Sequence, residues 1–556
     1  MKKQTKLVAV LSTAALLAIG ASMTSFAATG WAEEDGTWVY YDRNGDKVTD
    51  KWAKSGNNWY YLDNSGEMAI DQLIEDDDNY YYVDVNGVMA SNQWVAIENE
   101  DAGDEDEPEV YWYYFQANGK AMKNTTGKVA LKTINGKKYT FDDEGKMLYG
   151  WVNENNEHQD NTDGDAFKFA DYYFGDENDG AMTTGWLLTD ITYSEATEDA
   201  YKFTGAAFSD DEDQTRWFYF KSNGKKVKKA DTSDDLIKGK TINGKKYAFD
   251  EYGTMVAEWT LEAKEASANL ASRGNAKYSQ LWKYFNSVED GSRVTKGWFK
   301  VVAAENLDKT RYDDDEENWY YADGSGNIYA GEFKTIKGKK YAFQKDGRMV
   351  SGLKFINLDT FDVCADDKDG KEFDTEDGFM EHAPEYVNTG YNLYYFGNSS
   401  DGAMKTGKTN ITIDGDSFNF YLDKSGSTKG AGYNGEKDDK LYLAGMMLKA
   451  GSDDKYQVAK LEDGCWTKVD GAEKFINEEG IAHSVDADDV QATLDTLKIS
   501  KKAKDIKELY TVDENANYKL INTSGKIVDK SGKSKDGNDF VYVTKGENIV
   551  AIYVEK

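Results

Sequence analysis

WAEEDGTWVYYDRNG at residues 31–45 and WAKSGNNWYYLDNSG at residues 52–66 are two copies of one pattern. Each copy has a Trp, six further residues, a second Trp, an aromatic run and a closing Gly. A weaker third copy at residues 73–87 ends in NYYYVDVNG, and the three copies start 21 residues apart. A short fixed period of this kind is the signature of a repeat protein.

The pattern continues along the chain with insertions. Further copies include YWYYFQANGKAM at 111–122, DYYFGDENDGAMTTGW at 171–186, RWFYFKSNGKKV at 216–227, NWYYADGSGNIYAG at 318–331 and LYYFGNSSDGAMKTG at 393–407. A variant has Lys-Lys-Tyr in place of Trp-Tyr-Tyr, and its peptides TINGKKY at 133 and 241 and TIKGKKY at 335 are near-copies of one another. The repeats therefore fill the chain to about residue 430.

Each copy predicts a β-hairpin. The run WYYL at 59–62 has high β propensity, and DNSG at 63–66 has turn chemistry, so residues 67–70 are expected to return as the second strand. One hairpin alone is only marginally stable, so neighbours must bury its aromatic face. The predicted fold class is all-β, an elongated solenoid of stacked aromatic β-hairpin repeats with a degenerate C-terminal β-rich region.

Three segments are predicted. Residues 1–27 have a basic start, an apolar run and a small-x-small site, as in a secretory signal peptide. Residues 28–435 are tandem hairpin repeats with acidic loop insertions, among them 98–109 and 370–378. Residues 436–556 hold degenerate repeats or a small β-rich domain, with a short helix near 488–499 and a final hairpin at 540–543 and 549–554.

The composition limits the possible partners. The net charge is −34, which disfavours nucleic acid and anionic membranes and favours a cationic or neutral ligand. Aromatic residues make up 14% of the chain, so rings must supply much of the core. The two cysteines, Cys364 and Cys465, are too few for a disulfide framework, and the sequence leaves open whether they pair.

Strand side chains alternate between two faces, so Trp59 and Tyr61 are expected on one face and Tyr60 on the other. One face then builds the core, and the other lies between hairpins. Electron-rich rings grouped around a small space attract a quaternary ammonium by cation–π forces worth about 0.5–2 kcal/mol per contact. Flat rings also stack on sugars.

The repeat resembles the choline-binding, or cell-wall-binding, repeat of Gram-positive surface proteins. The TINGKKY units also look like repeats in the receptor-binding region of large clostridial toxins. The resemblance implies that choline of teichoic acid lies between successive hairpins, in a cage of aromatic rings with a nearby Met. It implies one cage of Trp31 and Trp38 with Trp52 or Trp59, and a second of Trp52, Trp59 and Tyr61 with Met68 and Tyr80. Later candidate pairs are Trp186 with Trp217 and Trp298 with Trp319.

No catalytic, cofactor or metal site is predicted. The three histidines, His158, His382 and His483, lie in no recognised motif, and neither a nucleophile elbow nor a phosphate-binding loop occurs. We therefore expect a non-catalytic secreted protein that is held non-covalently at the cell wall or cell surface, with no integral membrane segment. Two alternatives stay open, a lectin-like adhesin that binds glycans and a purely structural surface repeat protein.

Overall fold

The computed structural model describes residues 29–99, 102, 108–192, 213–230, 235–262, 275–364, 373–478 and 480–556. The predicted signal peptide and most of the acidic insertion at 98–109 lie outside these residues. The chain divides into two compact units. Unit 1 comprises Met1–Glu258 and Phe285–Ser292, and unit 2 comprises Trp259–Tyr284 and Arg293–Lys556.

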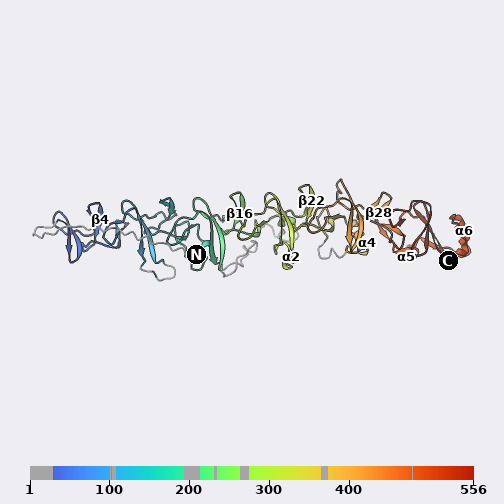
Figure 1. Ribbon diagram of the computed structural model, residues 1–556, viewed down its shortest axis with the longest axis horizontal. Coiled ribbons are helices and arrows are strands. Elements are labelled where there is room, and N and C mark those ends of the chain that lie inside the picture. The colour runs from blue at the N-terminus through green and yellow to red at the C-terminus, as the bar shows by residue number, and fades with distance from the viewer. Residues whose placement is uncertain are drawn as a thin grey trace. The chain divides into compact units, whose positions relative to one another are not determined.

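Two-stranded antiparallel hairpins form the described part of the chain as far as residue 395 (Figure 1). In unit 1 they are β1 (Gly30–Glu34) with β2 (Thr37–Tyr41), β3 (Lys51–Ser55) with β4 (Asn58–Leu62), β5 (Gln72–Asp76) with β6 (Asn79–Val83), β7 (Gln93–Glu98) with β8 (Val110–Phe115), β9 (Lys132–Ile134) with β10 (Lys137–Tyr139), β11 (Gly150–Val152) with β12 (Tyr172–Phe174), β13 (Gly185–Thr192) with β14 (Asp213–Phe220), and β15 (Lys238–Ile242) with β16 (Lys245–Phe249). The later hairpins are β17 (Glu258–Leu261) with β18 (Trp282–Phe285), β19 (Gly297–Val302) with β20 (Glu317–Ala322), β21 (Glu332–Ile336) with β22 (Lys339–Phe343), and β23 (Leu353–Asn357) with β24 (Tyr391–Tyr395). The prediction of a mostly β protein built from small antiparallel hairpins is confirmed.

The predicted pairing within a hairpin is wrong. The run at 59–62 belongs to β4, which pairs with the preceding strand β3 and not with residues 67–70. Residues 67–70 make isolated bridges such as Leu62↔Met68. In the hairpins without an insertion, the turn is the pair of residues just before the second strand. Asp35-Gly36 and Asn135-Gly136 both have two positive φ angles, the geometry that matches the right-handed twist of a hairpin.

The DNSG segment nevertheless forms the tight turn that its residues predict. The Asp63 carboxylate accepts hydrogen bonds from the N–H groups of Ser65 (2.8 Å) and Glu67 (2.9 Å). The Gly66 N–H donates to the Asp63 carbonyl at 2.9 Å, and Gly66 takes a φ of 77°. This turn therefore follows a hairpin and leads to the next one.

Successive hairpins are joined by backbone hydrogen bonds after these turns. The Met68 N–H donates to the Trp38 carbonyl of the preceding hairpin at 2.7 Å, and the Met89 N–H donates to the Trp59 carbonyl at 2.9 Å. The same bond recurs at Met349, whose N–H donates to the Trp319 carbonyl at 2.8 Å. Neighbouring hairpins are thus held in register within each unit, whereas one continuous solenoid stays a prediction.

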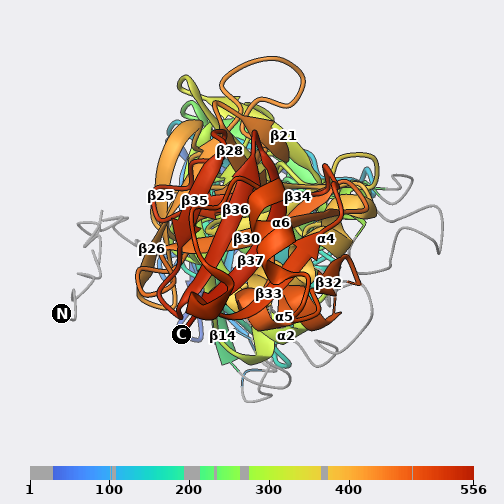
Figure 2. The same cartoon turned by 90° about the vertical axis from the view of Figure 1, so that its right-hand side faces the viewer.

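Wider sheets replace the hairpins in the C-terminal region (Figure 2). One five-stranded sheet has the order β25 (Gly407–Ile413), β26 (Asp416–Leu422), β29 (Met446–Met447), β28 (Lys440–Leu443) and β27 (Gly435–Lys437). A three-stranded sheet has the order β31 (Cys465–Lys468), β30 (Tyr456–Glu462) and β34 (Tyr518–Asn522). A second five-stranded sheet has the order β32 (Ala482–Ser484), β33 (Ile506–Val512), β37 (Asn548–Glu555), β36 (Phe540–Lys545) and β35 (Gly532–Lys535). The predicted segment boundary at 435/436 thus falls inside β27, and the predicted final hairpin is β36 with β37.

The helices are η1 (Ala166–Lys168), α1 (Ala276–Ser279), α2 (Lys309–Asp313), α4 (Glu376–Asn388), α5 (Gly471–Glu478), α6 (Val490–Thr496) and η2 (Ala503–Asp505). The expected helix near 488–499 is α6. The prediction of a loop at 370–378 is wrong for its last residues, because α4 begins at Glu376. Thr375 is the N-cap of this helix, and its side chain accepts the Gly378 N–H at 3.0 Å. Phe379 and Ala383 are buried one turn apart on α4. None of the helices in the described ranges is long and apolar enough to cross a bilayer.

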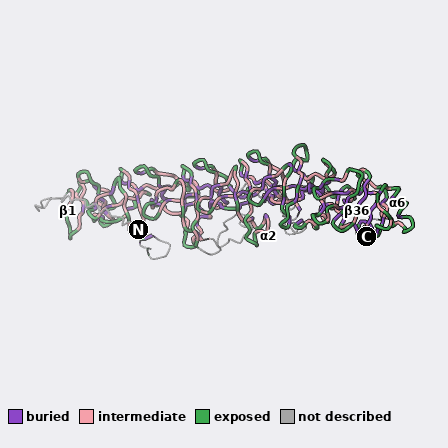
Figure 3. The backbone as a smooth tube through the Cα atoms, turned by 45° about the vertical axis from the view of Figure 1, so that its right-hand side comes forward, coloured by how far each residue is buried: buried purple, intermediate pink, exposed green. Residues whose placement is uncertain are grey.

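Buried residues follow the inside of the hairpins, and the turns are exposed (Figure 3). Small aromatic clusters form the core in the repeats, whereas a larger cluster around Phe379, Phe420 and Leu443 joins α4 to the first five-stranded sheet. Cys364 and Cys465 are free thiols buried in this larger cluster. The core thus changes from rings to mixed apolar packing where the hairpins give way to wider sheets.

Candidate ligand-binding ring clusters

The two faces of a repeat hairpin differ as the alternation predicts. In β3 and β4, Trp52 lies opposite Tyr61 and Lys54 lies opposite Trp59, so the two Trp rings and Tyr61 share one face. Ala53 and Tyr60 form a pair on the other face and are both buried. The Trp59 side chain is 40% exposed. One face is therefore core, and the other presents partly exposed rings.

The first Trp of a hairpin contacts two rings. Trp31 meets Tyr40 of its own hairpin at 5.3 Å between ring centroids and Tyr60 of the next hairpin at 5.2 Å, both in edge-to-face geometry. Trp52 repeats the arrangement with Tyr61 at 5.2 Å and Tyr81 at 5.0 Å. The central ring of each aromatic strand thus serves the core of its own hairpin and packs against the Trp of the preceding one.

We call this recurring group a ring cluster and name it after its first Trp. A ring cluster contains that Trp, the Trp two residues before its cross-strand partner, the central aromatic of the next hairpin and the Met that follows that hairpin. Among the described residues, five clusters have all four members: Trp31, Trp38, Tyr60 and Met68; Trp52, Trp59, Tyr81 and Met89; Trp94, Trp112, Tyr139 and Met147; Trp186, Trp217, Tyr247 and Met255; Trp298, Trp319, Tyr341 and Met349.

The predicted pairs of rings are close in two later clusters. Trp186 and Trp217 lie 5.9 Å apart between ring centroids, and Trp298 and Trp319 lie 6.4 Å apart. Both pairs are perpendicular, with interplanar angles of 83° and 87°. Each pair therefore offers one ring face beside one ring edge.

The N-terminal clusters differ from the predicted cages in their partner rings, and the Trp52 cluster differs also in its Met, because Met68 belongs to the Trp31 cluster and Met89 takes its place. The ring of the second hairpin that meets Trp31 is Tyr60, and not Trp52 or Trp59. Tyr80, predicted beside Trp52, lies opposite Glu75 in the next hairpin, and Tyr81 takes its place. The prediction assigned the central ring to the core alone, because alternation along one strand gives no information about the neighbouring hairpin.

The Trp94 cluster is missing from the sequence-based prediction. Trp94 meets Tyr139 at 4.9 Å, and Trp112 lies beside them in the same apolar cluster. The segment QWVAIE at 93–98 was the available signal, since its Trp precedes an aromatic strand as Trp31 and Trp52 do. The acidic insertion between the two strands hides this spacing.

Carboxylates surround the Trp52 cluster. The Trp52 indole N–H donates to the Asp76 carboxylate at 3.0 Å. Burial raises the pKa of Tyr61, and Asp50 and Asp76 raise it further. Burial and Asp76 also raise the pKa of Tyr81. Partly exposed rings among carboxylates favour a cation over an anion.

Lysine side chains lie over rings in several repeats. The Lys54 ammonium is 5.6 Å from the centroid of Trp59, and the Lys340 ammonium is 4.4 Å from that of Phe333. Phe333 occupies the position of the first Trp in its hairpin and contacts Tyr394 of the next one at 5.2 Å. The ring clusters therefore already lie within reach of cations that belong to the chain.

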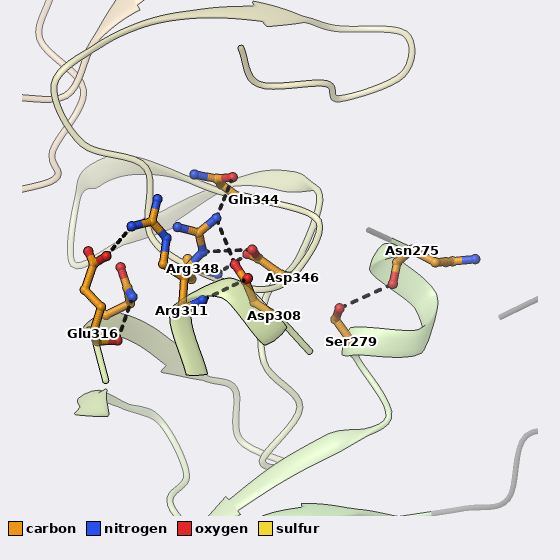
Figure 4. Close-up of polar contacts among 9 residues, drawn as sticks. Asn275, Ser279, Asp308, Arg311, Glu316, Gln344, Asp346 and Arg348 are labelled. Atoms are coloured by element: carbon orange, nitrogen blue, oxygen red, sulfur yellow. Dashed lines mark hydrogen bonds and ion pairs between the residues drawn. The ribbon is translucent and has the colours of Figure 1, made fainter. Parts of the chain in front are cut away.

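A polar network lies near the Trp298 cluster (Figure 4). The buried Arg348 guanidinium bonds to Asp346 at 2.8 Å, and to Asp308 and Gln344 at 3.3 Å each. Burial raises the pKa of Asp346, which the positive charge of Arg348 opposes. Arg311 pairs with Glu316 in the same view. Two hollows of about 350 and 380 Å³ adjoin this network and share Gln344 in their lining.

The choline-binding repeat matches residues 28–72 and 51–94 of the chain. Both the Trp31 and the Trp52 clusters lie within these residues. Among curated proteins, glucosyltransferase-S of Streptococcus mutans serotype c is 24% identical over 241 residues, which are 43% of this chain. The matched part is 11% of the length of that enzyme.

Three of the solved structures that resemble the chain come from Streptococcus pneumoniae. The modular autolysin LytC in complex with a synthetic peptidoglycan ligand is 18% identical, with 59% of this chain and 54% of that chain covered and a TM-score of 0.29. Choline binding protein F in the presence of a peptidoglycan analogue is 17% identical, with 76% and 98% covered and a TM-score of 0.22. CbpJ is 20% identical, with 58% and 99% covered and a TM-score of 0.23.

Proposed function

We propose that this chain, which carries choline-binding repeats, attaches non-covalently to a cell-wall polymer by holding quaternary ammonium groups of choline against its ring clusters. The observation that carries the proposal is the recurrence of one ring arrangement, with its first two copies inside the segment that matches the repeat. A role in attachment without catalysis, after export directed by residues 1–27, belongs to the same proposal.

The physical basis is cation–π attraction. A trimethylammonium group is attracted to ring faces, and each contact contributes about 0.5–2 kcal/mol. The surrounding carboxylates, such as Asp50 and Asp76, add long-range attraction for the positive charge. One site of this kind is weak, but several sites on one chain bind a polymer with many choline groups by avidity.

The first test is retention on a tertiary-amine resin in high salt, followed by elution with free choline. High salt is needed because a charge of −34 alone would hold the chain on a cationic resin. We expect retention of the full chain and elution by choline. Flow-through in high salt, or elution by salt alone, would contradict the proposal.

A variant locates the sites. Replacement of Trp38, Trp59, Trp112, Trp217 and Trp319 by Ala removes one partly exposed ring from each complete cluster and is expected to abolish retention. The matched control is Phe169→Ala with Tyr312→Ala, since these rings are 62% and 49% exposed. Far-UV circular dichroism of both variants checks that loss of retention does not come from unfolding. Equal retention of both variants would show that the clusters do not bind the amine.

Glycan binding is a second candidate, favoured by the hollow of about 380 Å³ beside the polar network of Figure 4. Arg311, Glu316, Asn318 and Gln344 line it, and amide, guanidinium and carboxylate groups together suit the hydroxyls of a sugar. Asn318→Ala with Gln344→Ala is expected to weaken binding of muropeptides in a titration calorimeter by at least about fivefold without changing choline elution. No heat with the unaltered chain would reject this candidate.

A further inference from the structure

Lys226 occupies the position that Met holds in the complete ring clusters. Its N–H donates to the Asp171 carbonyl of the preceding hairpin at 2.7 Å, as the Met68 N–H does to the Trp38 carbonyl. The carbon chain of Lys226 lies against Gly253 of the following turn, since a Cβ added to residue 253 would be only 2.8 Å from the Lys226 Cδ. The Met68 thioether lies against Gly87 in the same way. The side chain therefore starts along the path of the usual Met.

The ammonium of Lys226 then ends among aromatic rings. Its Nζ is 5.2 Å from the centroid of Trp151 and 5.7 Å from that of Phe218, and it donates to the Phe167 carbonyl. Trp151 and Phe218 are the first Trp and the central ring of successive hairpins, 5.1 Å apart, and so correspond to Trp31 and Tyr60. A cation of the chain thus lies against the ring pair that corresponds to a proposed ligand site.

This cluster is also closed to solvent. Trp151 is 2% exposed, Phe218 is fully buried, and Lys226 is 4% exposed. Helix η1, from the insertion between β11 and β12, contributes Ala166 and Phe167 to the same apolar cluster. Asp171 stands where complete clusters have a Trp, and its carboxylate pairs with Lys228 at 3.1 Å. The two Trp rings of a complete cluster, such as Trp186 and Trp217, are only partly buried instead.

We propose that Lys226 is a built-in cation that fills the Trp151 ring cluster, so that this cluster fastens two hairpins together and takes no external ammonium. The inference rests on the proposed function, because it assigns to one cluster the chain's own amine in place of choline. Lys226 thereby makes this one hairpin junction a permanent joint, whereas the complete clusters stay open to a ligand.

The charge on Lys226 depends on pH. Burial and the positive charge of Lys228 together lower the pKa of Lys226 to about 7, against the opposing effect of the Asp171 and Asp250 carboxylates. Burial in turn raises the pKa of Asp250 to about 6, which the charge of Lys226 opposes. A test of the ammonium is therefore best made at pH 6.

The test is chemical rescue of Lys226→Ala in the full chain. This change removes three carbons and the nitrogen, so n-propylammonium has the size of the missing group. Hydrogen exchange over residues 150–192 and 213–256 reports the local opening. We expect exchange in the variant to be faster by at least about tenfold and to return toward that of the unaltered chain in n-propylammonium chloride. Equal concentrations of sodium chloride and of n-propanol are expected to give no such recovery.

Two further variants sharpen the test. Lys226→Met restores the residue type of the complete clusters and is expected to show no rescue, because its side chain fills the space. Lys47→Ala changes a Lys at the same repeat position, whose ammonium lies 3.8 Å from Glu34, and is also expected to show none. If Lys226→Ala does not fold, the criterion is the pH dependence of hydrogen-exchange protection over the same residues. Protection is then expected to change between pH 6 and 9 in the unaltered chain and not to change in Lys226→Met.

The inference is wrong if n-propylammonium protects Lys226→Ala no more than it protects the unaltered chain. The same experiment keeps the proposed function separate, because choline protection of residues 29–92 reports the Trp31 and Trp52 clusters. If choline gives no protection of these residues, the proposed function is rejected, and the rescue of Lys226→Ala by n-propylammonium is judged separately.

Discussion

Phe218→Ala is expected to lower the local unfolding free energy of the hairpins around it by about 3–5 kcal/mol. Phe218 has no exposed surface and meets Trp151 at 5.1 Å and Phe167 at 5.8 Å between ring centroids. The truncation removes the ring on which Lys226 also packs, so both apolar burial and cation–π attraction are lost. No neighbouring hairpin can collapse into the space without breaking its backbone link.

Hydrogen exchange over residues 150–192 and 213–256 measures this effect, since a repeat chain need not unfold in one step. Phe169→Ala is the matched control, because it also removes a phenyl ring beside η1, but this ring is 62% exposed. Its effect is expected to stay within about 0.5 kcal/mol. Similar exchange in the two variants would contradict the placement of Phe218 in the core.

Gly432→Ala is expected to destabilise the first C-terminal sheet by about 3 kcal/mol. A Cβ at residue 432 would lie 2.2 Å from the Ala444 carbonyl oxygen and 2.6 Å from its carbon, so backbone must move. Both backbone segments are held in place, because the Gly432 N–H donates to the Leu393 carbonyl and the Gly445 N–H, in the turn between β28 and β29, donates to the Tyr433 carbonyl. The contact is made by backbone, so no change of rotamer relieves it.

Gly532→Ala is the control for this substitution in unit 2, since a Cβ there meets nothing within 4 Å. Thermal unfolding followed by circular dichroism, together with hydrogen exchange over residues 407–447, is expected to separate the two variants clearly. A Gly432→Ala chain as stable as the Gly532→Ala chain would contradict the close approach of the backbone at residue 432 to the turn at residues 444–445.

The candidate site was predictable in kind but not in detail. Trp31, Trp38, Trp52, Trp59, Trp186, Trp217, Trp298 and Trp319 all belong to complete ring clusters, and a regular motif was enough to select them. The partner rings Tyr60 and Tyr81 were not predicted, because each strand was interpreted by itself. The Trp94 cluster was missed because an insertion separates its two strands.

The sequence by itself determined the repeat, its β structure and the alternation of faces. These properties depend on local chemistry, namely the β propensity of aromatic runs, the positive φ of Gly and Asn in turns, and the period of two along a strand. The helical spacing that gives α6 is local in the same sense.

The tertiary structure alone decided which strand pairs with which, which ring meets which, and which Lys is buried against a pair of rings. Both the preceding and the following segment could pair with β4, and the tight two-residue turn at Gly56-Asn57, where Gly56 has a φ of 59°, determined the choice. Lys226 looks like any exposed Lys in the sequence, and only the packing of two hairpins and η1 buries it against Trp151. Contacts between segments far apart in the sequence depend on three-dimensional closure, and no local propensity encodes them.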